Sequence, residues 1–299
     1  MRHAYCIIAH NEPEVFKVLI SLLDDERNDI FIHVDKRSDI TLFNSIRTEY
    51  SRIYFLPKRI KTYWGGFSLT KVYLRILQYA FEKGEYKYYH ILSGVDLPIK
   101  SQDYIHHLFD VKYPGKEFVG IAGKEQDSWI RARAGFYYPF DKRHNFQRQG
   151  SPWGRLMYRI QYKLVAIQKR MRIIRSTDHF AMGPGWFSLT EPCVKYLLSH
   201  KKCILNRFKY TTIADEMAFQ TIIINSPFRS KIFDINDQYH SCLRKIDWER
   251  GNHKGSPYTW QEEDFEELIN NDEYCFARKF SQSNIEIAKK IEHHLSHYK

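Results

Sequence analysis

The stretch Thr62–Lys100, TYWGGFSLTKVYLRILQYAFEKGEYKYYHILSGVDLPIK, decides the fold, because it reads as turn, helix, strand and polar turn. Apolar residues recur at three- and four-residue steps over Ser68–Phe81, the period of a helix with one buried face. Tyr86–Leu92 is aromatic and β-branched and predicts a strand. The following SGVDLP cannot continue a regular strand. Asp96 therefore stands at the carboxyl end of a strand, where open α/β sheets bind their ligands.

Two adjacent glycines, Gly65 and Gly66, stand directly before the expected helix. Glycine accepts positive φ angles and lets another molecule approach the backbone closely. The free amides of a helix N-terminus also favour an anion such as phosphate. A Gly-Gly pair is, however, a common turn signal, so a plain tight turn is the simpler interpretation of these residues alone.

The chain before this stretch opens with strand, helix and strand. Tyr5–Ala9 reads as a buried strand, Glu14–Leu23 as an amphipathic helix and Ile30–Val34 as a second strand, with a short third strand at Ile53–Leu56. This order is typical of a Rossmann-like nucleotide-binding sheet. Asp35 comes directly after the second strand, and on its own it is more simply a capped loop residue than a ligand contact.

A chain of 299 residues, 43% of them hydrophobic, has enough apolar surface for one large α/β domain. The five cysteines are scattered and include no C-x-x-C pair, which favours a reducing compartment without disulfides or a zinc cluster. The apolar run near the N-terminus is far shorter than the roughly 18 to 20 residues of a membrane span. We therefore expect a single domain, residues 1–299, in the cytoplasm, with no signal peptide or membrane anchor.

The net charge of +11 and the pI near 9.2 predict anionic partners such as nucleotide phosphate, acidic lipid or nucleic acid. Nearly all of this charge lies in Lys142–Arg175, which contains ten Lys or Arg residues and no Asp or Glu. Ser151-Pro152 is a plausible helix start within it. Apolar residues then recur at steps of four, four, three and four: Leu156, Ile160, Leu164, Ile167 and Met171.

This predicted helix is basic and amphipathic, because its apolar stripe is bordered by Arg155, Arg159, Lys163, Lys169, Arg170 and Arg172. Such a helix can lie on an anionic bilayer, which would put the protein at the inner face of the cytoplasmic membrane. It can equally pack on the sheet through its apolar stripe and leave its charges in water. Binding to nucleic acid is a third interpretation, and the residues leave all three open.

An acidic pair marks the second half of the chain. Thr212–Ile224 begins as a turn and continues as a helix, with Asp215 and Glu216 in its first turn. Carboxylates are favoured at a helix N-terminus by the macrodipole, so capping explains one of them. Capping does not explain the pair together with its surroundings.

Several blocks together resemble a known family. TYWGG, HILSGVDLPIKS, HVDKRSD, ADEMAFQTIIINS, LRKIDW and FARKF run in family order from about Ala4 to Phe280. They look like glycosyltransferase family 14, the core-2/I-branching β-1,6-N-acetylglucosaminyltransferases and peptide O-xylosyltransferases. The resemblance implies a GT-A type fold, a mixed sheet flanked by helices, and inverting transfer from a UDP-sugar. Without the anchor and disulfides of animal members, the chain resembles a bacterial-type member.

The resemblance also implies a donor site. An acidic residue at the position of Asp35 helps to hold the uracil and ribose end of the donor. Trp64, beside the glycines, is suited to stack on a base or sugar. The implied donor contacts lie at strand ends and in the TYWGG turn: Ala9, Asp35, Thr62, Trp64, Gly65 and Asp96.

The remaining implied roles fall in the second half. Glu216 corresponds to the catalytic base, with Asp215 as its cap or orienting partner. Arg278 and Lys279, and less directly Arg244, correspond to the basic residues that hold the diphosphate. The block FAMGPGWFSL departs from the family at Gly185, where an acidic residue often contacts the acceptor. That acceptor contact is therefore in doubt for this chain.

We expect residues 1–123 to hold the UDP-sugar, and residues 124–299 to supply the acceptor site, the base and the phosphate clamp, with a basic helical insertion at about 142–175. Many sugar-nucleotide transferases hold a metal ion through Asp-x-Asp, and the sequence contains no such motif. A guanidinium or ammonium group can neutralise the leaving diphosphate instead. We therefore expect no metal and no other cofactor.

The sequence thus predicts a metal-independent inverting glycosyltransferase in surface polysaccharide synthesis. Its donor would be UDP-N-acetylglucosamine, or UDP-xylose as second choice, and its acceptor a glycan or lipid-linked glycan. A non-catalytic, membrane-docked scaffold would explain the basic helix but not the family blocks. A nucleic-acid-binding protein would explain the charge, although no nucleic-acid module signature accompanies it, so we expect no nucleic acid partner.

Overall fold

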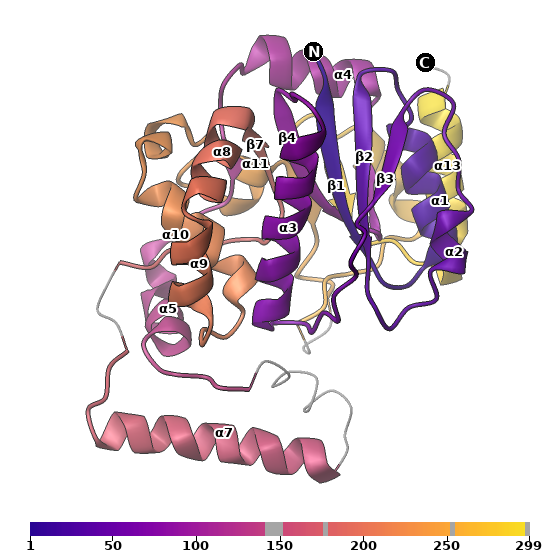
Figure 1. The fold of residues 1–299 in the computed structure, drawn as a ribbon. Helices are drawn as coiled ribbons and strands as arrows, with labels where there is room; N and C mark the ends of the chain where they lie inside the picture. Colours follow the sequence, from indigo (N-terminus) through magenta and orange to yellow (C-terminus); the bar gives the residue numbers. More distant parts are fainter. Residues whose placement is uncertain (141–151, 176–178, 252–254, 297–299) are drawn as a thin grey trace.

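The structure, a computed structural model, describes residues 1–140, 152–175, 179–251 and 255–296 and has a mixed α/β architecture (Figure 1). The central sheet has six strands, of which β1 to β4 are parallel. The strand β7 runs antiparallel to both of its neighbours. In spatial order the strands are β3 (Arg52–Phe55), β2 (Asn28–Val34), β1 (His3–Ala9), β4 (Tyr88–Ser93), β7 (Phe187–Thr190) and β6 (Phe118–Val119).

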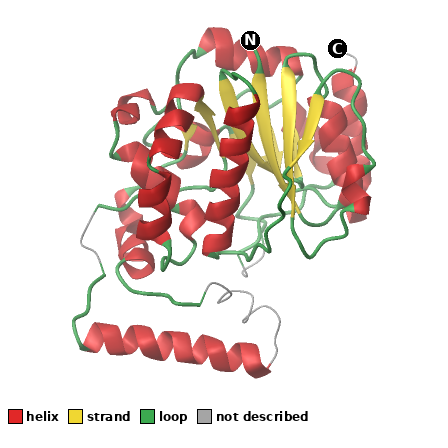
Figure 2. Ribbon diagram, viewed as in Figure 1, coloured by secondary structure: helices red, strands yellow, loops and turns green. Residues whose placement is uncertain are grey.

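Helices cover both faces of the sheet, as the secondary-structure colouring shows (Figure 2). Every residue of β1 and β2 is buried, which is the pattern of parallel strands enclosed on both sides. One face carries α3 (Phe67–Lys83), α8 (Glu191–Ser199), α9 (Lys201–Phe208) and α10 (Ala218–Ile224). The other carries α1 (Pro13–Leu23), α4 (Gln102–His107), α12 (Phe265–Ile269) and α13 (Ile285–Ser296).

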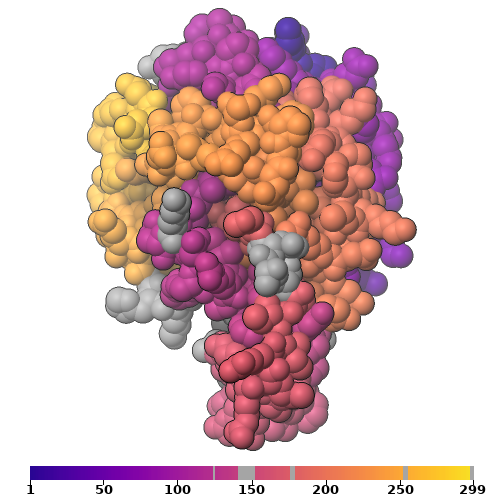
Figure 3. All heavy atoms as spheres, turned by 90° about the vertical axis from the view of Figure 1, so that its left-hand side faces the viewer, coloured from indigo at the N-terminus to yellow at the C-terminus, as the bar shows by residue number. Residues whose placement is uncertain are grey.

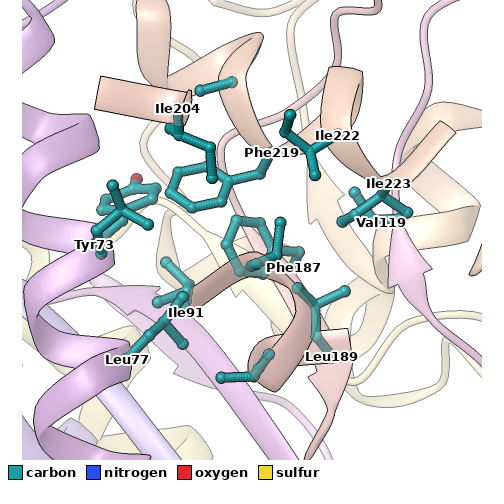
Figure 4. Close-up of a cluster of buried hydrophobic side chains, with 14 of the residues drawn as sticks. Tyr73, Leu77, Ile91, Val119, Phe187, Leu189, Ile204, Phe219, Ile222 and Ile223 are labelled. Atoms are coloured by element: carbon teal, nitrogen blue, oxygen red, sulfur yellow. The ribbon is translucent and has the colours of Figure 1, made fainter. Parts of the chain in front are cut away.

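The core on the α3 face joins the two halves of the chain (Figure 4). Tyr73 and Leu77 of α3 lie in one buried cluster with Ile91 of β4, Phe187 of β7 and Phe219 of α10. The rings of Phe187 and Phe219 are 5.3 Å apart between centroids, an ordinary separation for a favourable aromatic pair. The expected α/β fold, a mixed sheet flanked by helices in a single domain, is confirmed.

A second, three-stranded sheet connects the organising stretch to the end of the chain. Its strands are β5 (Asp96–Pro98), β9 (Phe276–Arg278) and β8 (Arg244–Ile246), with β5 antiparallel and β8 parallel to β9. In this register Asp96 is the partner of Arg278. The remaining described helices include α2 (Thr41–Asn44) and α11 (Gln238–Cys242).

The sequence of Lys124–Tyr138 is irregular in pattern and rich in Arg and aromatic residues, which is typical of a loop over a site. In the structure this segment contains the helix α5 (Asp127–Ala134). Only Ile130 and Ala134 of this helix are buried. Two apolar positions one turn apart are too short a pattern to reveal a helix in a sequence. The sequence also predicts one short helix at Asp103–Asp110, whereas in the structure α4 ends at His107 and the chain continues as a π-helical turn, Leu108–Lys112.

The basic segment forms α7 (Pro152–Arg170), while residues 142–151, including the predicted start at Ser151, lie outside the described part. Figure 3 shows α7 projecting beyond the rest of the molecule. Its buried side, Gly154, Gln161 and Val165, is not the apolar stripe, so the interpretation that the stripe packs on the sheet is wrong. None of the described helices is long and apolar enough to cross a membrane.

Candidate active site

A cleft of about 530 Å³ opens where β1 and β4 end. Its walls include the residues after β1, the turn before α3, the turn before α10, the residues before β7 and the segment around β9. Six residues predicted for the site line it: Thr62, Trp64, Asp215, Glu216, Arg278 and Lys279. The structure therefore brings the predicted donor, base and phosphate residues to one cavity.

Asp35 lies behind the cleft wall and organises it. Its amide donates to the Ala9 carbonyl at 2.8 Å, which joins the ends of β2 and β1. Its carboxylate accepts hydrogen bonds from the amide and hydroxyl of Thr62 and from the amide and guanidinium of Arg37. Burial raises the pKa of Asp35, but these donors outweigh it and hold the pKa well below its usual range. Asp35 thus presents Arg37 and Thr62, which do line the cleft.

Gly65 acts through its backbone. It adopts φ +66°, a conformation that favours glycine. Its carbonyl accepts a hydrogen bond from the amide of Ile213 at 2.8 Å, and Ile213 begins the turn that carries Asp215 and Glu216. Beside Gly65 and Gly66 there is a cavity of only about 10 Å³, so the phosphate interpretation of the glycine pair is not supported. The tight turn is the better interpretation, and it joins the donor wall to the acidic pair.

Asp96 holds Arg278, the first of the two cations, Arg278 and Lys279, that we call the clamp. Its carboxylate accepts from the Arg278 guanidinium at 2.5 Å and from the Ser93 amide at 2.7 Å. The Arg278 guanidinium also lies 4.2 Å from the centre of the Trp186 ring, within cation–π range. Asp96 is buried and does not line the cleft. Its role in this geometry is to aim Arg278 into the cavity.

Lys279 supplies the second cation. Its ammonium group donates to the Ser256 hydroxyl at 2.5 Å, and both residues line the cleft. The Lys279 carbonyl accepts from the amide of Trp260, a fully buried residue. The backbone at this end of β9 is therefore anchored in the core while the charged end of Lys279 faces the cavity.

Glu216 lines the same cleft and has a different environment. The Arg133 guanidinium, from α5, is 3.1 Å from its carboxylate. Burial raises the pKa of Glu216 above its usual value, although Arg133 acts in the opposite direction. About a third of the side chain is exposed, so a molecule in the cleft can reach it. A carboxylate with a raised pKa that borders a cavity is suited to accept a proton.

Asp215 and Gly185 meet beside Glu216. Asp215 is 8% exposed and lines the cleft. A Cβ atom at Gly185 would lie 3.6 Å from an Asp215 carboxylate oxygen and 3.4 Å from the Tyr73 hydroxyl. These are ordinary van der Waals distances, but an acidic side chain at position 185, which the family often carries, would begin beside the Asp215 carboxylate. The local carboxylate is Asp215 instead.

Two predicted residues lie elsewhere. Arg244 is 2% exposed, and its guanidinium donates to main-chain carbonyls, among them that of Cys242, and to the Ser188 hydroxyl. We therefore correct the prediction of a phosphate contact at Arg244, which is a core residue. Ala9 is also fully buried, and its side chain abuts Gly94, where an added Cβ would lie 2.9 Å away.

The cleft also contains residues to which we assigned no role from the sequence, among them His10, Arg37, Trp186 and Trp248. Burial and nearby Arg278 lower the pKa of His10. For Arg37 the sequence offered one signal, because Arg37 stands two residues after Asp35, the acidic residue that directly follows β2. Trp186 and Trp248 stand in the family blocks FAMGPGWFSL and LRKIDW, which was a usable signal, but the blocks alone do not place these rings in the cleft.

One group of three described residues could hold a metal ion, and it lies away from the cleft. It consists of His3, His106 and Asp110. His3 begins β1, whereas the cleft opens beyond the other end of that strand. Asp110 is already hydrogen bonded to His3 and paired with Lys87 at 3.1 Å. This cluster has no part in the candidate active site.

The cleft combines three chemical functions. Arg278 and Lys279 offer positive charge for a diphosphate, which charge-assisted hydrogen bonds hold well. Trp64, 40% exposed, offers a flat apolar surface. Glu216 offers a proton acceptor in the same cleft. Such a cavity suits a reaction in which an anion leaves while a nucleophile loses a proton.

Comparison with known proteins agrees with this geometry. The family model described as Core-2/I-Branching enzyme matches residues 3–269. Xylosyltransferase 2 of Rattus norvegicus is 25% identical over 317 residues, which cover 99% of this chain and 34% of that protein. Xylosyltransferase 1 of Homo sapiens is 25% identical over 287 residues, which cover 89% of this chain and 27% of that protein. The chain thus spans about a third of the length of such relatives. It belongs to the Core-2/I-Branching enzyme family.

Proposed function

We propose that this protein is an inverting glycosyltransferase that moves a sugar from a UDP-sugar to a hydroxyl group of a glycan. The observation that carries the proposal is one cleft that is lined both by two cations, Arg278 and Lys279, and by Glu216, a carboxylate with a raised pKa. Family membership and the names of the xylosyltransferase relatives support sugar transfer. For the donor we propose UDP-N-acetylglucosamine or UDP-xylose.

The donor would lie along the strand ends. Thr62 and Arg37, both held by Asp35, would face the nucleoside, and Trp64 would stack on a ring of the donor. The diphosphate would meet Arg278 and Lys279. Asp96 and Ser256 would orient these two cations.

Transfer would take place in one displacement. A Glu216 carboxylate oxygen accepts the proton of the acceptor hydroxyl as that oxygen attacks the anomeric carbon of the sugar. The bond between the anomeric carbon and the diphosphate oxygen breaks, its electron pair leaves with UDP, and the configuration inverts. The proton on Glu216 passes to solvent when the products leave. General-base assistance of this kind contributes about 10²- to 10⁴-fold to a rate.

We propose that Arg278 and Lys279 stabilise the leaving diphosphate and that no metal ion is required. Donors that already point at the place where charge develops stabilise a transition state most effectively. The Asp96 contact and the Trp186 ring hold the Arg278 guanidinium in one position. The missing Asp-x-Asp motif supports the same proposal.

We further propose that the acceptor is a glycan of surface polysaccharide synthesis, carried on a lipid at the inner face of the cytoplasmic membrane. The support for this choice is the long basic helix α7. The corresponding family position for an acidic acceptor contact is Gly185, so we assign the acceptor side to Asp215 and its neighbours.

A test that needs no known acceptor uses water in its place. The protein is incubated in EDTA with each UDP-sugar, and the released sugar is followed by proton NMR. From an α-linked donor, an inverting enzyme releases the β anomer first. Early release of the α anomer would contradict inversion, and release that requires added Mn²⁺ would contradict the metal-free clamp.

A further inference from the structure

The apolar stripe of α7 has no cover in the described structure. It consists of Trp153, Leu156, Ile160, Leu164, Ile167 and Met171, and its exposed fractions reach 65% at Trp153 and 64% at Met171. The attached side of the helix is a neighbouring one, which carries the buried Gln161 and Val165. There Gln161 and Gln168 hydrogen bond to the backbone of residues 137–140. Large exposed apolar patches on soluble domains mark interaction surfaces.

Basic residues lie beside this stripe on the outer side of the helix. At 100° per residue, Arg159, Lys163 and Arg170 fall on the face next to the stripe and away from the buried Gln161. All three are exposed. A helix with an apolar stripe and a neighbouring row of cations is built to lie in the interface of an anionic membrane.

The helix is also on the same side of the molecule as the cleft. The strands β1 and β2 run toward the end of the body beneath which α7 lies (Figure 1). The cleft opens at that end, beyond the last residues of β1 and β4. A surface that contacts α7 would therefore lie on the side from which the cleft is reached.

A second cavity lies beside α5 and the end of α7. It measures about 620 Å³ and is lined by residues of α5, by Phe136, by Lys169 of α7 and by Phe180. The same helix α5 carries Arg133, which contacts Glu216. The helix α5 therefore borders a cavity shared with Lys169 of α7 and also contacts Glu216, the proposed base.

We propose that α7 docks on an anionic phospholipid bilayer, with its apolar stripe inserted among the lipids and its basic row against the headgroups. In this position the cleft faces the membrane. The orientation rests on the proposed function, because it would present Glu216 to an acceptor that is carried on a lipid. The docking itself does not depend on that function.

Charge favours a bilayer over the other partners that could cover the stripe. A second copy of the chain would bring two strongly basic helices together, and like charges repel. Nucleic acid would satisfy the cations but leave the apolar stripe exposed to water. An anionic bilayer satisfies both surfaces at once, and each basic residue near it strengthens binding about fivefold, which corresponds to about 1 kcal/mol.

The test is co-sedimentation of the purified protein with vesicles, either of phosphatidylcholine alone or with one third phosphatidylglycerol. We expect binding to the anionic vesicles and at least tenfold weaker binding to the neutral ones. The double variant Arg159→Glu/Lys163→Glu should lose at least tenfold in binding. The matched control Lys289→Glu/Lys290→Glu, on α13, should bind like the native protein.

Insertion of the stripe needs a separate readout. Leu164→Ser/Ile167→Ser should weaken binding about tenfold although its charge is unchanged. Brominated lipids should quench Trp fluorescence in the native protein, and that quenching should be largely lost in Trp153→Phe. The thermal midpoint should not change in any variant, because the substituted side chains are exposed in the described part of the chain.

The outcomes separate the possibilities. Equal binding to neutral and anionic vesicles, or equal binding of the two double charge variants, would overturn the proposal. So would a dimer in analytical ultracentrifugation that dissociates in Leu164→Ser/Ile167→Ser, because it would assign the stripe to a second copy. Vesicle binding by a protein that does not bind UDP would leave the docking intact and refute the proposed function instead.

Discussion

Two carboxylates in the walls of the cleft, Asp35 and Glu216, have opposite surroundings. Asp35 is buried and saturated with donors from Thr62 and Arg37, which hold its pKa well below the usual range. Glu216 is partly exposed, burial raises its pKa, and Arg133 is its single ion-pair partner among the described residues. A carboxylate whose pKa is held well below the usual range stays ionised, so it can hold the cleft residues Thr62 and Arg37 in place. One whose pKa is raised is better suited to accept a proton.

The largest effect should come from Glu216. Glu216→Gln should reduce transfer about 10²- to 10⁴-fold, while the affinity for UDP stays nearly the same, because the amide keeps the shape and removes only the proton acceptor. The check is steady-state kinetics together with calorimetry of UDP binding. Glu191→Gln, at the start of α8, is the control for losing a carboxylate at a helix N-terminus. Retained turnover would remove Glu216 from the role of base.

Asp35→Asn should instead reduce stability, by about 1–3 kcal/mol, since buried donors of Thr62 would lose an ionised acceptor. The sign of the pH dependence follows from the lowered pKa. The contribution of Asp35 is complete above the unfolded pKa of about 4 and is lost as the pH falls toward the lower folded value. Urea unfolding at pH 7 and pH 3 should therefore show a difference from the native protein that shrinks at pH 3.

The control for that comparison is Asp39→Asn, which changes an exposed carboxylate nearby. It should leave the free energy of unfolding within about 0.5 kcal/mol. If Asp35→Asn were as mild as this control, or if it abolished transfer in a fully stable protein, Asp35 would not be the organising residue described here.

Lys279→Ala should weaken UDP binding about tenfold and uridine binding hardly at all, because the ammonium group is proposed to meet phosphate. Isothermal titration with both ligands measures the two losses. Lys245→Ala, in the neighbouring strand β8, removes a lysine that does not line the cleft and should change neither affinity. Equal losses for UDP and uridine would place Lys279 elsewhere than at the diphosphate.

The smallest expected effect on activity is that of replacing Arg133. Its guanidinium favours the ionised form of Glu216, so Arg133→Gln should raise the pKa of Glu216 further. The acidic limb of the kcat profile should then move to higher pH, while activity at alkaline pH changes little. Arg131→Gln, on the same helix, is the matched control. An unchanged limb in Arg133→Gln would mean that Glu216 is not the group that titrates.

The sequence predicts those parts of the site whose position depends on nearby residues along the chain. The end of β2 at Asp35 and the turn that carries Asp215 and Glu216 follow from strand length, helix period and the family blocks. The contact between Asp96 and Arg278 does not, because these residues are 182 positions apart and meet only through the pairing of β5 with β9. Nothing in the sequence of β8 distinguishes Arg244, a core residue, from a phosphate ligand.

The helix α7 is a second case in which the sequence predicts local structure but not the contacts of that structure. Its periodicity correctly predicts a helix with an apolar stripe, but periodicity cannot say what the stripe packs against. The structure leaves the stripe exposed, because Gln161 and Gln168, polar residues on a neighbouring side of the helix, attach it to residues 137–140. Two glutamine side chains in a basic segment carry no signal of that attachment.

The most direct test of the proposed donor site is calorimetric titration with UDP, UDP-N-acetylglucosamine and UDP-xylose, each in excess EDTA and again with Mn²⁺. We predict micromolar binding in EDTA, with one of the two sugars preferred. Binding that appears only with Mn²⁺ would contradict the clamp formed by Arg278 and Lys279. No binding under either condition would contradict the donor site as a whole and favour a membrane-docked scaffold.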